Sequence, residues 1–276
     1  MFGNNVATGN GANASGELST NVATGASADA SGIGSQNVAM GSNAKAGGVF
    51  TANTAIGANS VATGVNSSAF GAGAQALGGQ RAAFGFGSVA NGGNSLAVGA
   101  GNTVTGDNSG AFGTHQTVNG KGSFGIGDPN TLNGNGSFVF GDGNSVNGGS
   151  TAGFGDNIQV TGSNNTVAGT ASAACSSVFG SGNTVNATNA MVMGSGSTVT
   201  GSNGVAIGNN VSVARANGVP SAPVQARISR TPRPSAVARR RPAPISRRSA
   251  PPAIPTPWAA SPRRRAARRR ADRCRS

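Results

Sequence analysis

The chain has 276 residues, 47 of them glycine, and a formal net charge of +13. This charge is unevenly distributed, because residues 1–212 hold three cations and six anions, whereas 17 arginines lie from Arg215 onward. No run approaches the ~18 apolar residues of a membrane-spanning helix, and no charged leader with an apolar segment follows Met1. We therefore expect neither an export signal nor a membrane anchor within these residues.

The first part of the chain repeats every 16 residues. Gly9, Gly25, Gly41 and Gly57 mark this period, and a second glycine series beginning at Gly16 divides each repeat into halves of seven and nine residues. A fixed short period is typical of a solenoid, in which each repeat stacks on the one before it.

From Gly57 the period becomes 14 residues, in two halves of seven. A half of this length has room for a strand of about four or five residues and a tight turn, but not for a capped helix. Each repeat therefore predicts a coil of strand, turn, strand and turn in an all-β parallel solenoid. The pairs that mark the period are Ile56-Gly57, Phe70-Gly71, Phe84-Gly85, Val98-Gly99, Phe112-Gly113, Ile126-Gly127, Phe140-Gly141 and Phe154-Gly155.

The spacing is interrupted between Gly155 and Gly180, and the 14-residue period then resumes up to Gly208. We expect one coil around Val167 and an irregular turn over 170–177. The whole repeat region then contains about thirteen coils and spans roughly 60 Å at ~4.8 Å per coil.

Two columns of apolar residues are expected to fill the interior of the solenoid. Because their neighbours are mostly alanine and glycine, the interior is thin, and many coils or several chains side by side are needed for stability. The first column is Val104, Val118, Leu132, Val146 and Val160, and the second is Phe70, Phe84, Val98, Phe112, Ile126, Phe140 and Phe154.

Few residues suggest chemistry. Asp128, Asp142 and Asp156 recur at 14-residue spacing, which predicts a stack of carboxylates about 5 Å apart. The stack is either a site for a hard cation such as calcium or a row of solvated turn residues, and we favour the row because aspartate accepts turn conformations. His115, the single histidine, has no cysteine or acidic cluster beside it. We expect no catalysis, no cofactor and no small-molecule substrate.

A basic segment, residues 214–276, follows the repeats. Eleven prolines and 16 arginines lie after Gly218, so we expect this segment to be disordered and able to bind nucleic acid or another polyanion. The composition changes inside a repeat, near residue 212, and a segment rich in Ala, Arg, Pro and Ser is typical of a GC-rich gene read out of frame. We favour this frameshift hypothesis, which translation of the other two frames tests. The densest arginines are Arg263, Arg264, Arg265, Arg268, Arg269 and Arg270.

A hexapeptide of the type Asn-Ser-Val-Ala-Ile-Gly recurs through residues 3–213, in close form at 94–99 and 203–208. These repeats resemble the haemagglutinin-like head repeats of trimeric autotransporter adhesins, the YadA-like family of bacterial surface proteins. The resemblance implies a left-handed parallel β-roll, an exception to the usual right-handed crossover. It also implies homotrimers displayed on the outer membrane and virulence through adhesion to collagen, other matrix proteins or host surfaces.

Residues 1–213 would then form the adhesin head, while the signal peptide, neck, stalk and anchor of the family are not found in this sequence. The alternative is a protein that binds nucleic acid or anionic surfaces through its basic segment. For the adhesin, we expect the Asn/Ser turn edges of the coils to contact the ligand. The candidate residues are Asn94, Ser95, Asn108, Ser109 and Asn203.

Overall fold

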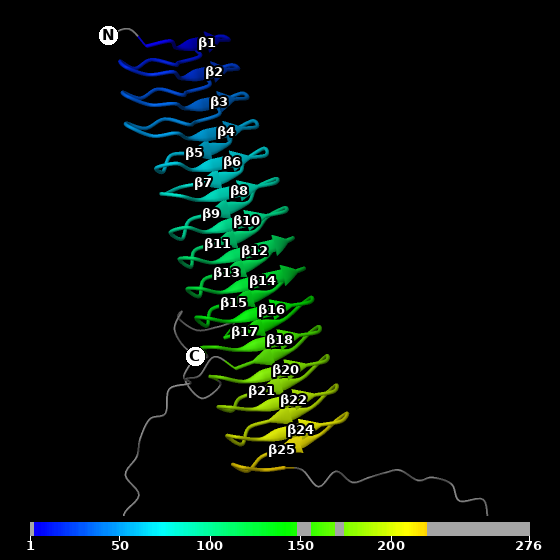
Figure 1. Cartoon of the computed structure of the whole chain (residues 1–276). Coiled ribbons are helices and arrows are strands. Elements are labelled where there is room, and N and C mark those ends of the chain that lie inside the picture. The colour runs from blue at the N-terminus through cyan, green and yellow to red at the C-terminus, as the bar shows by residue number, and fades with distance from the viewer. Residues whose placement is uncertain (1–2, 148–155, 169–173, 220–276) are drawn as a thin grey trace, which may run out of the picture. The chain divides into compact units, whose positions relative to one another are not determined.

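The structure is a computed structural model that describes residues 3–147, 156–168 and 174–219. These residues belong to one compact unit, residues 1–222. They form a parallel β-solenoid whose coils follow one another from β1 to β25 (Figure 1). Within this described part, no helix is long and apolar enough to cross a membrane.

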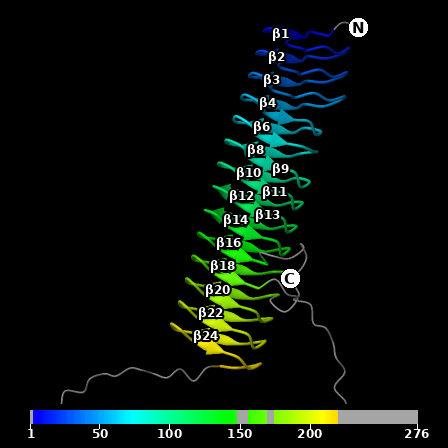
Figure 2. The same cartoon turned by 180° about the vertical axis from the view of Figure 1, so that it is seen from behind.

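Each coil contributes one strand to a 14-stranded sheet, here called the long sheet, and later coils contribute a second strand to an 11-stranded short sheet (Figures 1 and 2). Every pairing is parallel and in register, so 14 coils are present, one more than expected. The long sheet comprises β1 (Val6–Thr8), β2 (Val22–Thr24), β3 (Val38–Met40), β4 (Thr54–Ile56), β6 (Ser68–Phe70), β8 (Ala82–Phe84), β10 (Leu96–Val98), β12 (Gly110–Gly113), β14 (Phe124–Gly127), β16 (Phe138–Phe140), β18 (Gln159–Thr161), β20 (Ser177–Phe179), β22 (Met191–Met193) and β24 (Val205–Ile207). The short sheet comprises β5 (Val61–Ala62), β7 (Gln75–Ala76), β9 (Val89–Ala90), β11 (Thr103–Val104), β13 (Thr117–Val118), β15 (Thr131–Leu132), β17 (Ser145–Val146), β19 (Thr166–Val167), β21 (Thr184–Val185), β23 (Thr198–Val199) and β25 (Ser212–Val213).

The strands are shorter than the four or five residues expected. Most long-sheet strands have three residues and short-sheet strands have two, because the turn residues on either side take up most of each half. In the first three coils the short sheet is reduced to single bridging residues, Asn13, Asp29 and Lys45, which lead to β5. The last coil continues to Gly218, whose carbonyl accepts a hydrogen bond from the N–H of Val205.

The register changes between β16 and β18, where Phe138 pairs with Gln159, 21 residues later. The seven additional residues equal one half-coil, so glycines still recur every seven residues in the sequence. After the insertion, however, the half that would have formed a short-sheet strand forms a long-sheet strand, and the reverse. The assignment of Val160 to the column of Val104 is therefore wrong. Val160 pairs with Val139 in the long sheet, and Val167 continues the short-sheet column after Val146.

From β2 onward, the interior is filled by the central residue of each long-sheet strand and the second residue of each short-sheet strand. The short-sheet column confirms Val104, Val118, Leu132 and Val146 as core residues. The opposing long-sheet column contains alanines such as Ala83 and Ala97 up to β12, glycine in β14, valines from β16 to β22 and Ala206 in β24. Residues 154 and 155, which the glycine period also included, lie outside the described residues.

The placement of the phenylalanine column in the core is wrong. Phe70, Phe84, Phe112, Phe140 and their neighbours Val98 and Ile126 occupy the third position of their strands and face outward. Phe140 is 60% exposed and Ile126 is 42% exposed. Successive side chains of a strand point to opposite faces, so a buried central alanine turns both flanking residues outward.

A ladder of buried polar side chains runs along the solenoid axis. Most members accept a hydrogen bond from the backbone N–H of the equivalent residue in the next coil, as Asn130 does from Asn144 and Asn144 does from Asn165. Gln116 instead accepts from the side-chain nitrogen of Asn130. The ladder satisfies backbone donors at the turns, where the sheet pairing ends. Its members are Ser88, Asn102, Gln116, Asn130, Asn144, Asn165, Asn183 and Ser197.

Candidate functional site

The three aspartates do not form one column. The N–H of Asp128 donates to a carboxylate oxygen of Asp142 at 3.0 Å, so these two residues stack in successive turns after β14 and β16. Asp156 instead accepts a hydrogen bond from the N–H of Asn135 at 2.9 Å, in the turn before the long-sheet strand. The expected three-carboxylate stack is wrong because the half-coil insertion moves Asp156 to the other series of turns.

The candidate Asn/Ser turn residues divide into two groups. Asn94, Asn108 and Asn203 are exposed, and each has a positive φ between 53° and 55°. Asn94 donates from its side chain to Asn108 at 3.0 Å, which makes an asparagine stack on the surface of the turns. Ser95 and Ser109 are 2% and 1% exposed, so neither can contact a ligand. The exposed asparagines are the members of this set that a partner can reach.

Other residues considered for chemistry are isolated. His115 is exposed in a turn at φ 51°. Among the described residues, no group of three or more His, Cys, Asp or Glu side chains could hold a metal ion. The arginines proposed to bind anions, from Arg263 to Arg270, lie outside the described residues.

The most extensive unusual surface is the outer face of the long sheet. The first and third residue of each strand point outward and form two columns along the solenoid axis. Throughout the described strands, none of these outer positions, two on each of the 14 strands, carries a charged residue. Large apolar residues dominate from β3 to β24, and Phe70 stacks on Phe84 with ring centroids 5.0 Å apart. We call this surface the apolar face.

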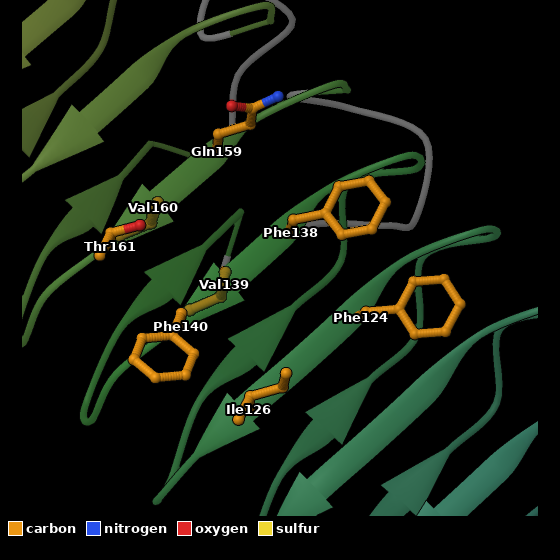
Figure 3. Close-up of a pocket in the computed structure, with 8 residues that line it drawn as sticks. All are labelled: Phe124, Ile126, Phe138, Val139, Phe140, Gln159, Val160 and Thr161. Carbon is orange, nitrogen blue, oxygen red and sulfur yellow. The ribbon is translucent and has the colours of Figure 1, made fainter.

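A hollow of about 250 Å³ interrupts the apolar face at β14, β16 and β18. Phe124 and Phe138 lie side by side in one column, with ring centroids 5.6 Å apart (Figure 3). Ile126 and Phe140 form the other wall, and the smaller polar residues of β18 close the end. The hollow arises where bulky aromatic residues meet the shorter side chains of the next strand.

The outer face of the short sheet has the opposite character. Its first column is rich in threonine from Thr103 to Thr198, and its second contains hydrogen-bonded asparagines. This second column consists of the residues that follow the short-sheet strands, and in it the hydroxyl of Thr105 donates to the side-chain oxygen of Asn119 at 2.5 Å. The solenoid therefore presents one apolar face and one polar face on opposite sheets.

Sequence reasoning missed the apolar face, although a signal for it was present. In β4, β6, β8 and β10 the residue before the outward-facing third residue is an alanine, and these alanines, Ala55, Ala69, Ala83 and Ala97, are fully buried. A repeated small residue at the centre of a three-residue strand indicates which residue points inward.

Comparisons with protein-family models and with curated proteins find no match for the chain.

Proposed function

We propose that the chain is a non-catalytic adhesin head of the YadA-like type, in which copies associate through the apolar face and bind a host surface together. The observation that carries this proposal is the uninterrupted absence of charge on both outer columns of the long sheet. A monomeric soluble protein rarely exposes so long an apolar surface, which instead marks an interaction site.

The size of the apolar face is appropriate for association. Fourteen strands at ~4.8 Å spacing extend over roughly 60 Å, and two side-chain columns are about 10 Å wide. The face therefore offers roughly 600 Å² per copy, close to the ~800 Å² per partner of a standard stable interface. Association also covers the thin alanine-lined core from one side. Three copies is the number that the family resemblance implies.

Once the apolar face is covered, the short sheet and the turns remain available to a partner. Threonine and asparagine side chains recur on them at the spacing of the coils, as at Asn94 and Asn108. A ligand that is itself repetitive, such as collagen or another matrix protein, can contact several equivalent positions at once. Linked weak contacts can raise avidity on the order of 10²–10⁴ over one site. We place this head on the cell surface, beyond the outer membrane.

Removal of residues 220–276 is expected to leave binding to immobilised collagen unchanged, because the described solenoid ends its last coil at Gly218. The measurement is surface plasmon resonance of the full chain and the shortened chain on fibrillar collagen and on double-stranded DNA, with albumin as control. Loss of collagen binding on truncation, together with salt-sensitive DNA binding by the full chain, would contradict the adhesin proposal and favour the basic segment.

A further inference from the structure

We propose that Gln159 and Thr161 on β18 pair with each other across the interface between neighbouring copies and fix the register of the assembly. This inference rests on the proposed association of copies through the apolar face. Strand β18 would then determine how neighbouring copies align, because the rest of the apolar face makes several alignments nearly equal in energy.

The strand β18 differs from every other described strand of the long sheet. It alone has polar side chains at both outer positions, Gln159 and Thr161, and both are exposed (Figure 3). Neither side chain makes a hydrogen bond to another residue in the described part of the chain. Both line the hollow next to Phe138 and Phe140, so a partner that covers the hollow also covers them.

A second copy of the chain suits this surface because it repeats the same row spacing over the same 14 strands. In a closed cyclic assembly about an axis parallel to the solenoid, equivalent rows lie at the same height, whereas a shift of one coil between neighbours gives a staggered assembly that does not close. The column formed by the first residues of the strands in one copy then faces the column formed by the third residues of the strands in its neighbour. Gln159 therefore meets Thr161 of the next copy only when the copies are aligned without a shift.

The two side chains are chemically complementary in that alignment. The amide N–H of Gln159 can donate to the hydroxyl oxygen of Thr161, and the threonine O–H can donate to the amide carbonyl. A shift by one coil places Gln159 against Phe140 or Phe179 instead, which leaves a covered polar group without a partner. Most other rows tolerate such a shift because they exchange one apolar residue for another. A single polar layer sets register in coiled coils in the same way.

The test reads register directly with a photo-cross-linker. Phe84, at the third position of β8 and distant from β18, is replaced by p-benzoyl-phenylalanine in the full chain. Cross-linked dimers are isolated on a denaturing gel, and the attachment site is mapped by mass spectrometry. Aligned copies give attachment at Ala82 of the neighbour, whereas a shift of one coil gives Ser68 or Leu96.

We expect attachment at Ala82 alone in the otherwise unchanged chain, and additional attachment at Ser68 and Leu96 when Gln159→Leu and Thr161→Val are combined. The control, Thr54→Val with Ser177→Ala, removes two polar outer groups whose strands keep the apolar residues Ile56 and Phe179. It should retain the single attachment site.

The outcomes separate the two levels of the proposal. A folded chain that stays monomeric would overturn the proposed association itself. An assembled parent with one register, and a Gln159→Leu/Thr161→Val variant with the same single register, would overturn only the role of β18. A folded variant that no longer assembles would also overturn it, because the pair would then supply affinity and not alignment.

Discussion

Replacement of Gly113 by alanine is expected to prevent the coils around β12 and β14 from stacking. Gly113 has a φ of +123°, and a Cβ added there would lie 1.9 Å from the carbonyl oxygen of Gly127 in the next coil. That oxygen cannot withdraw cheaply, because it accepts hydrogen bonds from the N–H of Thr114 and from the side chain of Gln116. We expect a loss of at least about 4 kcal/mol in the free energy of unfolding, or no folded protein.

The matched control is Gly208→Ala. Gly208 has nearly the same φ, +122°, but an added Cβ would meet only the side chain of Val211, at an ordinary contact distance of 3.5 Å. Only the conformational penalty remains, about 1–2 kcal/mol. Urea unfolding followed by far-ultraviolet circular dichroism measures both variants. Equal destabilisation would show that left-handed strain alone, without close stacking of the coils, determines the cost.

Replacement of Asn144 by alanine is expected to cost about 3–5 kcal/mol of unfolding free energy. The side chain is 2% exposed, donates to Asn130 Oδ1 at 2.9 Å and to the carbonyl oxygen of Gly162 at 2.7 Å, and accepts from both nitrogens of Asn165. Alanine fills none of these roles and leaves the buried backbone N–H of Asn165 without its acceptor. The ladder thus loses its continuity at one coil.

Asn209→Ala is the control for this substitution. Asn209 is exposed and accepts one hydrogen bond, from the N–H of Ser195 at 3.1 Å. Water can replace that acceptor, so a loss below about 1 kcal/mol is expected. Thermal unfolding followed by calorimetry compares the two variants. A similar change in both would mean that the buried ladder contributes no more than a surface bond.

The fold was predictable because the glycine period depends on the stacking itself. Gly57, Gly71 and Gly85 recur where the backbone of one coil approaches the next too closely for a Cβ. No side chain can substitute there, so the period is preserved in the sequence even where the other residues vary. The period alone predicts a parallel solenoid.

The orientation of the strands was not predictable from hydrophobicity. Phe84 and Val104 are both large apolar residues on the same period, yet Phe84 is 39% exposed and Val104 is fully buried. Burial depends on which residue of a short strand faces inward, and that is set by the turns at both ends. The small central residues Ala83 and Ala97 indicated the inward position in the early coils, but this signal is absent from β16 to β22, where valines such as Val139 occupy the same position.

The site assignments failed at the insertion for a related reason. Seven additional residues preserve the spacing of glycines, so Asp156 remains in phase with Asp142 in the sequence. In space it lies in the other series of turns, beside Asn135. The pairing of Phe138 with Gln159 is needed to see this exchange, and with it the position of the polar strand β18. Periodicity determines the spacing of coils but not which half-coil a residue occupies.

The most direct test of the account is the mass of the full chain in solution. Sedimentation velocity should give a homotrimer, three times the 26.5 kDa of one chain. Phe140→Asp, which places a charge in the middle of the apolar face without disturbing the core, should reduce the mass to one chain and keep the circular dichroism spectrum. Thr198→Asp, on the outer face of the short sheet, should remain trimeric. A folded parent chain that sediments as a monomer at every concentration, or a Phe140→Asp chain that stays trimeric, would contradict assembly through the apolar face.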